Sequence, residues 1–254
     1  MHPSLFSLGP LVFHSYGLMV AIGVFFSILF LRSQSERIPV APETVVDLAL
    51  VALVSGFVGA RVFYAAQFWG YFREAPIDVL KLWQGGIVLY GGLIGGLIGF
   101  SIFIRIRRLP FVPLLDLFMP AVALAQGFGR IGCFLNGCCF GIETHLPWGA
   151  RFPLLNNPVH PTQLYESVFC FLLFGVLFFL LFRRKHLKNG MVALSYFILY
   201  PTGRFFIEFL RGDHRRIWLS LTVSQWIGLV IFSLSLSIFV FWVVYDRKKV
   251  RHSS

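Results

Sequence analysis

Long apolar stretches separated by short polar segments dominate the pattern of the chain. Seven stretches are long enough to cross a bilayer, because a hydrocarbon core of about 30 Å needs about 20 helical residues. The fourth and sixth, like the second, each contain an arginine, and we regard these two as the least regular. The pattern predicts membrane-spanning helices at 11–31, 45–69, 86–104, 113–134, 164–182, 190–209 and 219–245.

One long segment, 135–163, does not follow the apolar pattern. It is rich in Pro, Asn, His and Gly, and we interpret it as an extramembrane head inserted between the fourth and fifth spans. The sequence therefore predicts an all-α polytopic membrane protein of about seven helices. We expect residues 1–254 to form a single integral membrane domain.

Composition supports this interpretation. Charged residues make up 13% of the chain and hydrophobic residues 57%, whereas a soluble domain has about 25% charged residues. The net charge of +11 would suggest nucleic acid as the partner of a soluble protein, but in a membrane protein it is typical of loops that face anionic lipid. We therefore expect membrane lipids, and no nucleic acid, as partners. No Lys or Arg precedes the first apolar run, so we expect a retained span and not a cleaved signal peptide.

The distribution of basic residues predicts the orientation. The connections that follow the first, third and fifth spans, together with the C-terminal tail, carry most of the basic residues, and that side should be cytoplasmic. The N-terminus and the 135–163 head are then outside and the C-terminus is cytoplasmic. Thirteen of the 22 basic residues are on the cytoplasmic side: Arg32, Arg37, Arg105, Arg107, Arg108, Arg183, Arg184, Lys185, Lys188, Arg247, Lys248, Lys249 and Arg251.

Three arginines, Arg61, Arg130 and Arg204, lie inside predicted spans. At a helical rise of about 1.5 Å per residue, each falls in the outer half of the membrane, near the depth of lipid phosphates. Guanidinium groups bind phosphate oxygens bidentately, so three at one depth favour a phospholipid head-group site. The alternative is that they reach the interface or pair with acids, as Arg204 and Glu208 would at i,i+4 spacing.

Other polar or small residues are expected near the same level. His14 and Tyr16 open the first span and Tyr90 opens the third, where histidine and tyrosine are also typical of a membrane interface. The third span also carries overlapping small-xxx-small patterns that include Gly91 and Gly92. These patterns are typical of close helix packing, and close approach to a ligand is the other interpretation.

The four cysteines give a weak metal signal. Cys133, Cys138 and Cys139 have C-x4-C-C spacing, unlike the paired spacing of zinc sites, so we predict no metal and no cofactor. Cys170 lies in an apolar run and is best explained as a buried hydrophobic residue. Under oxidising conditions Cys133 could form a disulfide with Cys138 or with Cys139.

The motifs together resemble a known family. "HSYGLM", "GARVFY", "GGIVLYGGLIGG", "GRIGCFLNGCCFG", "LPWGARFP", "HPTQLYES" and "YPTGRFFIEFLR" occur in the order found in bacterial prolipoprotein diacylglyceryl transferases, over nearly the whole chain. The resemblance implies an inner-membrane enzyme with phosphatidylglycerol and a prolipoprotein lipobox as substrates. Such enzymes move the diacylglyceryl group to the lipobox cysteine thiol and release glycerol 1-phosphate.

The resemblance also implies roles for individual residues. Arg130 matches the essential arginine of the signature, and Tyr90 stands where the family often has a proposed catalytic histidine. Cys133 and Cys138 stand where the family usually has asparagine and glutamate, which leaves the identity of the base open. Further motif positions are matched by Tyr16, Asn136, Gly141, Arg204, Glu208 and Arg211.

From the chemistry we expect Arg130 and Arg204 to stabilise the leaving phosphate. Tyr90 is expected to position the reacting thiol or to relay its proton, and His14 is the alternative base. His160 and Gln163 are expected to line the access path of the protein substrate, braced by Tyr165 and Glu166. A simple hydrogen-bonded turn explains that segment equally well. Outside the spans, the basic residues expected to guide the lipid are Arg211, Arg215 and Arg216.

Two other function classes fit the same residues. One is a transporter of anionic lipids, although no internal repeat is evident. The other is an inactive relative that binds lipid or lipoprotein, which the substitutions at Cys133, Cys138 and Tyr90 leave open.

Overall fold

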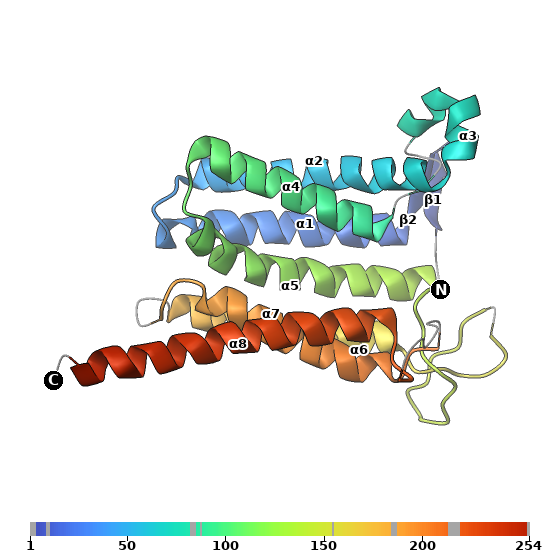
Figure 1. Cartoon of the computed structure of the whole chain (residues 1–254). Helices are drawn as coiled ribbons and strands as arrows, with labels where there is room; N and C mark the ends of the chain where they lie inside the picture. Colours follow the sequence, from blue (N-terminus) through green and yellow to red (C-terminus); the bar gives the residue numbers. More distant parts are fainter. Residues whose placement is uncertain are drawn as a thin grey trace. The chain divides into compact units, whose positions relative to one another are not determined.

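The computed structural model describes residues 4–8, 11–81, 85–86, 88–153, 155–183, 187–212 and 219–252. Across these residues long helices dominate (Figure 1). Short elements flank them: the helix α3 (Trp69–Glu74), the 3-10 turns η1 (Ser35–Arg37) and η2 (Pro76–Leu80), and an antiparallel hairpin of β1 (Ser4–Leu8) and β2 (Leu11–His14). The long helices are α1 (Ser15–Gln34), α2 (Pro42–Gln67), α4 (Leu89–Arg107), α5 (Phe111–Asn136), α6 (Thr162–Phe182), α7 (Met191–Glu208) and α8 (Val223–His252).

Each predicted span coincides with one of these helices, so the helical polytopic fold is confirmed. Among the described residues six helices are long and apolar enough to cross a membrane, and α7 falls outside that set. Because α7 has only 18 residues and carries Arg204 and Glu208, it is less apolar than the others. The number of crossings and their orientation stay predictions.

Some predicted boundaries were wrong. The first span was expected from residue 11, but Leu11–His14 pair with β1 and the helix begins at Ser15. The third span begins at Leu89 instead of residue 86, because Gly86 has a left-handed backbone with φ of 79°. The last begins at Val223, after the left-handed residues Leu219 and Ser220.

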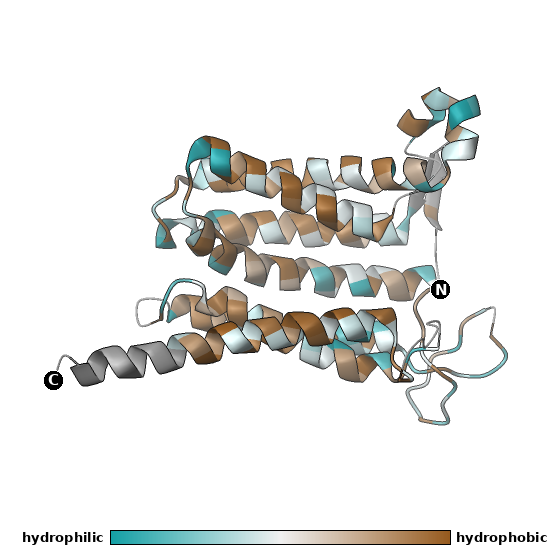
Figure 2. Cartoon of the chain, in the orientation of Figure 1, coloured by the Kyte–Doolittle hydropathy of each residue, from teal (hydrophilic) through white to brown (hydrophobic). Residues whose placement is uncertain are grey.

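The helix surfaces are apolar on most sides (Figure 2). Large hydrophobic side chains such as Val54, Leu97 and Leu172 are exposed. The apolar window of α8 is only 11% buried, whereas that of α5 is 50% buried. Helices that expose this much apolar surface need lipid around them, because water would make such exposure unfavourable.

The described chain divides into two compact units, and the unit Ile28–Phe111 is built around α2 and α4. These helices meet at small residues. A Cβ added to Gly59 would lie 2.4 Å from the carbonyl oxygen of Gly91 and 2.8 Å from the Cα of Gly95. The two backbones therefore touch directly, which confirms the close-packing interpretation of the small-xxx-small pattern.

The other unit comprises Met1–Ser27 and Val112–Ser254. Within it, the buried carboxylate of Asp116 in α5 accepts hydrogen bonds from the backbone N–H groups of Gly190 (2.6 Å) and Ala193 (2.9 Å). These donors open α7, whose first N–H groups have no partner inside the helix. Asp116 thus caps α7 from a neighbouring helix and holds the N-terminal end of α7 at a defined height along α5.

The connection from α5 to α6 is non-helical, as the sequence predicts. It is held by isolated bridges that pair Glu143 and Ala150 with Val159. Its location outside the membrane, and the single integral domain of residues 1–254, stay predictions.

We expect Gly59→Ala to destabilise the protein by about 1–3 kcal/mol, because the added methyl group would overlap the α4 backbone. The matched control is Gly175→Ala in α6, where an added Cβ meets nothing within 4 Å and helix propensity improves. Thermal denaturation in detergent should give a lower midpoint for Gly59→Ala only. Equal midpoints for the two variants would contradict this packing.

Candidate functional site

A continuous chain of ion pairs links α5, α6 and α7. Arg130 contacts Glu166 through Nη2 and Oε1 at 3.0 Å, and Arg204 donates to the other oxygen of Glu166. Arg204 also contacts Glu208 at 2.8 Å, and the Nε of Arg211 lies 3.9 Å from the same carboxylate. The predicted Arg204–Glu208 pair is confirmed. We call these five residues the arginine network.

The arginine network carries more positive than negative charge. It contains three guanidinium groups, which stay protonated, and two carboxylates. The carboxylate side chains are almost completely buried, at 2% exposed for Glu166 and 0% for Glu208, whereas the Arg130 side chain is 22% exposed. The unbalanced charge therefore faces outward through Arg130, which suits an anionic ligand.

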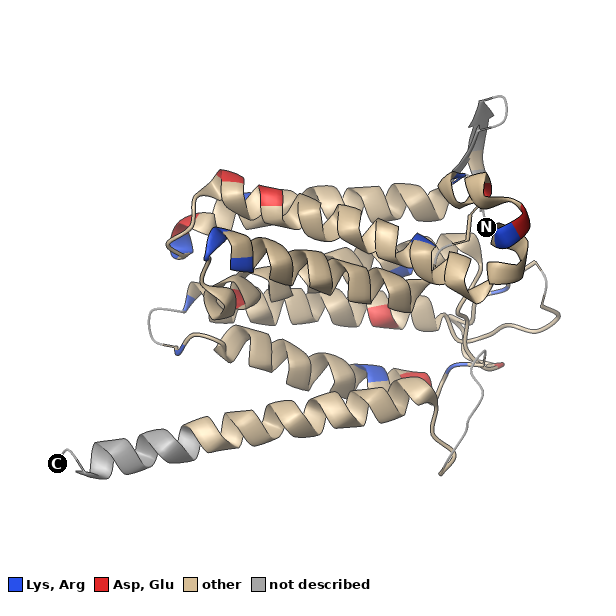
Figure 3. Ribbon diagram, turned by 45° about the horizontal axis from the view of Figure 1, so that its top comes forward, with Lys and Arg blue, Asp and Glu red and all other residues tan. Residues whose placement is uncertain are grey.

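Figure 3 shows that charged residues outside the arginine network lie mostly towards helix ends.

Neutral side chains add hydrogen bonds to the two carboxylates. The Tyr200 hydroxyl donates to Glu166 at 3.2 Å, and the Thr222 hydroxyl donates to Glu208 at 2.9 Å. Tyr200 stacks on Tyr196, whose hydroxyl donates to Gln126 on α5. Hydrogen bonds that accompany ion pairs lower the cost of burying the charges, so these contacts help to stabilise the network.

Gly141 lies where three segments meet. Its N–H donates to the His160 carbonyl at 2.8 Å, and the N–H of Ile142 donates to Leu210 at 2.8 Å. A Cβ at Gly141 would lie 2.5 Å from the Leu210 carbonyl oxygen, so only glycine fits without a shift. This junction fixes Arg211, which bridges to Gly141, beside the end of α7.

Gln163 and His160 adjoin the start of α6. The Gln163 Nε2 donates to the Cys138 carbonyl at 2.6 Å. Its buried Oε1 has no hydrogen-bond partner among the described residues, and a buried acceptor without a donor is unfavourable. His160 Nδ1 lies 3.2 Å from the Tyr165 hydroxyl, which also accepts from Trp148. Tyr165, which was predicted to brace the access path, contacts His160.

Three other predicted site residues are Tyr16, His14 and Asn136, of which Tyr16 and Asn136 lie near the end of α5. The Tyr16 ring packs on Gly132, where an added Cβ would lie 3.1 Å from Cδ2 of the tyrosine. Tyr16 and His14 are exposed, and Asn136 is exposed as the last residue of α5. None of the three has a side-chain contact to the arginine network in the described part of the chain.

Arg61, by contrast, is committed to the protein itself. It is buried, and each of its five N–H groups donates to a backbone carbonyl. No donor is left over for a phosphate, which argues against the predicted head-group role. The alternative interpretation, in which Arg61 pairs with an acid, is not seen in the described residues either, because its partners are backbone carbonyls. The acceptors are Val79 (2.7 Å), Gly85 (2.6 Å), Gly86 (3.0 Å), Lys81 (3.2 Å) and Asp78.

The loop that Arg61 holds contains its own charged pair. Lys81 contacts the Asp78 carboxylate at 2.6 Å, and the Tyr71 hydroxyl donates to it as well. Hydrogen bonds from Lys81 and Tyr71 lower the pKa of Asp78 below its usual value. The carboxylate therefore stays charged at neutral pH and helps to close the loop.

Tyr90, Gly91 and Gly92 lie in the first turn of α4, in the unit that also holds Arg61. Tyr90 is 51% exposed. Gly91 packs against Gly59, and the carbonyl oxygen of Gly92 faces Gly56. The glycines are thus used for helix packing, and the roles of all three residues in a site stay predictions.

Sequence reasoning missed the central position of Glu166. It was expected to brace the access path, whereas it joins Arg130 to Arg204. The available signal was an acid in the second turn of an otherwise apolar helix, near the expected depth of Arg130 and Arg204. Tyr200 and Thr222 carried no such signal, since a single hydroxyl group in or beside a helix is common. The predicted guide residues Arg215 and Arg216 lie outside the described residues.

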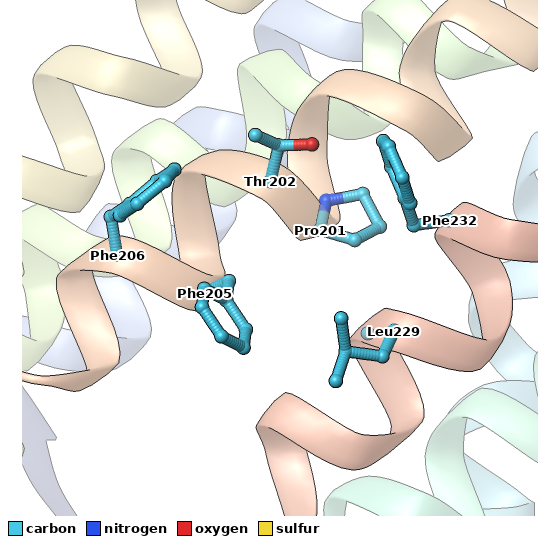
Figure 4. Close-up of a pocket in the computed structure, with 7 residues that line it drawn as sticks. Pro201, Thr202, Phe205, Phe206, Leu229 and Phe232 are labelled. Carbon is cyan, nitrogen blue, oxygen red and sulfur yellow. The ribbon is translucent and has the colours of Figure 1, made fainter. Parts of the chain in front are cut away.

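An apolar pocket of about 140 Å³ lies between α7 and α8, and Phe205, the residue after Arg204, is part of its lining (Figure 4). Its aromatic and aliphatic lining offers almost no polar surface, so it suits a hydrocarbon group. The lining residues are Pro201, Thr202, Phe205, Phe206, Gly228, Leu229 and Phe232.

Comparisons with known proteins place the chain in one family. A family model described as prolipoprotein diacylglyceryl transferase matches residues 3–242. Three similar proteins are named phosphatidylglycerol–prolipoprotein diacylglyceryl transferase. That of Clostridium tetani is 39% identical and covers 98% of this chain and 100% of its own. Those of Lactobacillus johnsonii and Bacillus velezensis are 37% and 34% identical, covering 99% and 95% of this chain and 92% of their own. With its apolar helices, the chain is a multi-pass membrane protein.

We expect Glu166→Gln to destabilise the protein by about 3–5 kcal/mol, because it leaves two arginines without their shared buried carboxylate. Glu143→Gln, on an exposed carboxylate of the α5–α6 connection, is the matched control. Thermal denaturation in detergent measures both. A Glu166→Gln midpoint equal to that of the control would show that the network does not stabilise the fold.

Proposed function

Since the chain belongs to the prolipoprotein diacylglyceryl transferase family, we propose that it transfers the diacylglyceryl group of phosphatidylglycerol to the lipobox cysteine of a prolipoprotein. The observation that carries the proposal is the match to family members over nearly the whole chain. The arginine network supports it, because an outward-facing positive charge suits a lipid phosphate.

The proposed reaction is a displacement at carbon. The thiol sulfur forms a bond to the glycerol CH2 carbon, and the bond from that carbon to the phosphate oxygen breaks. The electron pair leaves with the phosphate, which becomes glycerol 1-phosphate, and the thiol proton goes to a base. The reaction therefore needs a cation for the leaving group and an acceptor for the proton.

Arg130 and Arg204 meet the first need in this proposal. Both pair with Glu166, so their guanidinium groups are held near each other by one carboxylate. A preorganised pair needs little rearrangement when charge develops on the leaving phosphate. Glu208 and Arg211 extend the network, and Arg211 adds a further positive charge.

The proton acceptor in the proposal rests on sequence. Tyr90 is exposed and occupies the position where the family often has a histidine, and its hydroxyl can position the thiol or relay its proton. Arginines near a thiol also favour its thiolate, which lowers the demand on the base. His14 is the alternative acceptor.

Phosphatidylglycerol and the lipobox peptide need polar contacts for their hydroxyl or N–H groups, and the lipid needs an apolar surface for its acyl chains. The remaining residues can supply both. The unpartnered Oε1 of Gln163 can accept a hydrogen bond from a lipid glycerol hydroxyl or a peptide N–H. The apolar pocket beside Arg204 is suited to an acyl chain. We propose lipobox or lipid contacts for the exposed Tyr16 and Asn136 and for the half-buried His160. Gly141, Gly91 and Gly92 contribute in this proposal through the close packing that positions their neighbours.

We further propose that the protein lies in the bacterial inner membrane with its site towards the periplasm. The arginines in the last turns of α1 and α4 and in the connections that follow them support this orientation; they are Arg32, Arg37, Arg105, Arg107 and Arg108. Seven crossings, with α7 among them, fit an external N-terminus and a cytoplasmic C-terminus.

A purified sample tests the proposal against its two alternatives. It is incubated in detergent with phosphatidylglycerol and a lipobox peptide. The proposed enzyme makes a thioether-linked peptide and glycerol 1-phosphate. A transporter or an inactive relative makes neither product, and absence of both from folded protein would reject the proposal.

We expect Arg130→Ala and Arg204→Ala each to lower the transfer rate by on the order of 10²–10³, the usual cost of losing one donor to a developing anion. Arg130→Lys should also stay low, since lysine keeps the charge but loses the planar fork. Arg73→Ala, an exposed arginine of α3, is the control and should be unaffected. The peptide assay measures all four, and wild-type rates in both alanine variants would remove the arginines from the mechanism.

We expect Tyr90→Phe to lower kcat, by about 10²-fold or more where the hydroxyl carries the proton, because phenylalanine keeps the ring and removes the proton site. Tyr71→Phe, which removes an exposed hydroxyl of α3, is the control. Rates are compared across pH in the peptide assay. Full activity of Tyr90→Phe would exclude any role for this hydroxyl and favour His14.

A further inference from the structure

Three cysteine thiols converge in the described residues where α5 ends. Cys133 lies in the last turn of α5, and Cys138 and Cys139 follow that helix. Their Sγ atoms all lie within 4.8 Å of one another, although the sequence spacing is unlike that of common zinc sites. All three are half-buried free thiols. We call these residues the thiol cluster.

The spacing of the thiol cluster matches metal ligation better than disulfide bonding. The Sγ atoms of Cys138 and Cys139 are 3.7 Å apart. Zinc–sulfur bonds of about 2.3 Å in a tetrahedron separate two sulfur ligands by about 3.8 Å. A disulfide needs sulfurs about 2.0 Å apart, and it would leave one of three thiols unused.

The backbone holds the thiol cluster in place. Gln163 donates to the Cys138 carbonyl at 2.6 Å, and the Thr162 hydroxyl donates to the Cys139 carbonyl at 2.9 Å. Both donors are buried side chains in the first turn of α6. With these carbonyls fixed, the orientation of the neighbouring thiols is also restricted.

Cys139 itself has an unusual conformation. Its φ is 64°, in the left-handed region that residues other than glycine seldom adopt. Such conformations cost on the order of 1–3 kcal/mol and are concentrated at functional sites. With this conformation the Cys139 sulfur lies beside the sulfurs of Cys133 and Cys138.

We propose that Cys133, Cys138 and Cys139 form a binding site for a thiophilic metal ion, with Zn²⁺ as the best match. Soft thiolate ligands favour such ions over Mg²⁺ or Ca²⁺, which take oxygen ligands. Binding releases the thiol protons and leaves a fourth position for water. The ion would tie the last turn of α5 to the residues that follow it, and it takes no part in the proposed transfer reaction.

The test measures Zn²⁺ binding by the full-length protein in detergent. The sample is reduced, freed of metal and reductant without oxygen, and incubated with Zn²⁺, and bound zinc is measured by elemental mass spectrometry after desalting. We expect about one ion per chain, because three thiolates and water complete one tetrahedral site. The variant with serine at positions 133, 138 and 139 should bind none, whereas Cys170→Ser should bind as wild type.

A second measurement avoids variants that fail to fold. In the wild-type protein, Zn²⁺ should slow alkylation of all three thiols of the cluster by at least tenfold, as followed by peptide mass spectrometry. Unchanged alkylation, or equal zinc binding by wild type and the triple variant, would overturn the proposal. A disulfide within the cluster in protein alkylated inside cells and isolated without reductant would overturn it as well.

Discussion

The shared carboxylate of Glu166 is the interaction on which the rest of the site depends. Two arginines on different helices repel each other, and in an apolar environment that repulsion is poorly screened. Glu166 lies between them and contacts Arg130 and Arg204 with different oxygens. Without it, helices α5 and α7 could not bring two guanidinium groups to the same place. The carboxylate is thus the reason that a cationic site can exist inside an apolar bundle.

The network must also keep a surplus of charge to be useful. Equal numbers of arginines and acids would give a stable but inert cluster. Here the third arginine, Arg211, is fixed by the junction at Gly141, and Arg130 is the partly exposed member. In the proposed reaction the lipid phosphate supplies the missing negative charge. Substrate binding would then complete the charge balance, which links stability of the site to its function.

Several features could be predicted from sequence because they depend on local pattern. Apolar runs gave every long helix, and i,i+4 spacing gave the Arg204–Glu208 pair. The partner of Arg130 could not be predicted in this way, since Glu166 is 36 positions away and meets it only after α5 and α6 pack. The thiol cluster was missed for a related reason, because it is assembled by a left-handed turn at Cys139 and not by regular spacing.

The contrast between Arg61 and Arg130 shows why depth in the membrane is insufficient evidence of ligand binding. Sequence placed both at the same level, and both are charged groups in apolar helices. Arg61 is buried, and its five N–H groups are all used by backbone carbonyls of one loop. Among the described residues Arg130 has one ion pair, through Nη2, and its side chain is partly exposed. An arginine in a membrane helix can bind a ligand only with donors that the protein has not already used, so the number of remaining donors separates a structural arginine from a functional one.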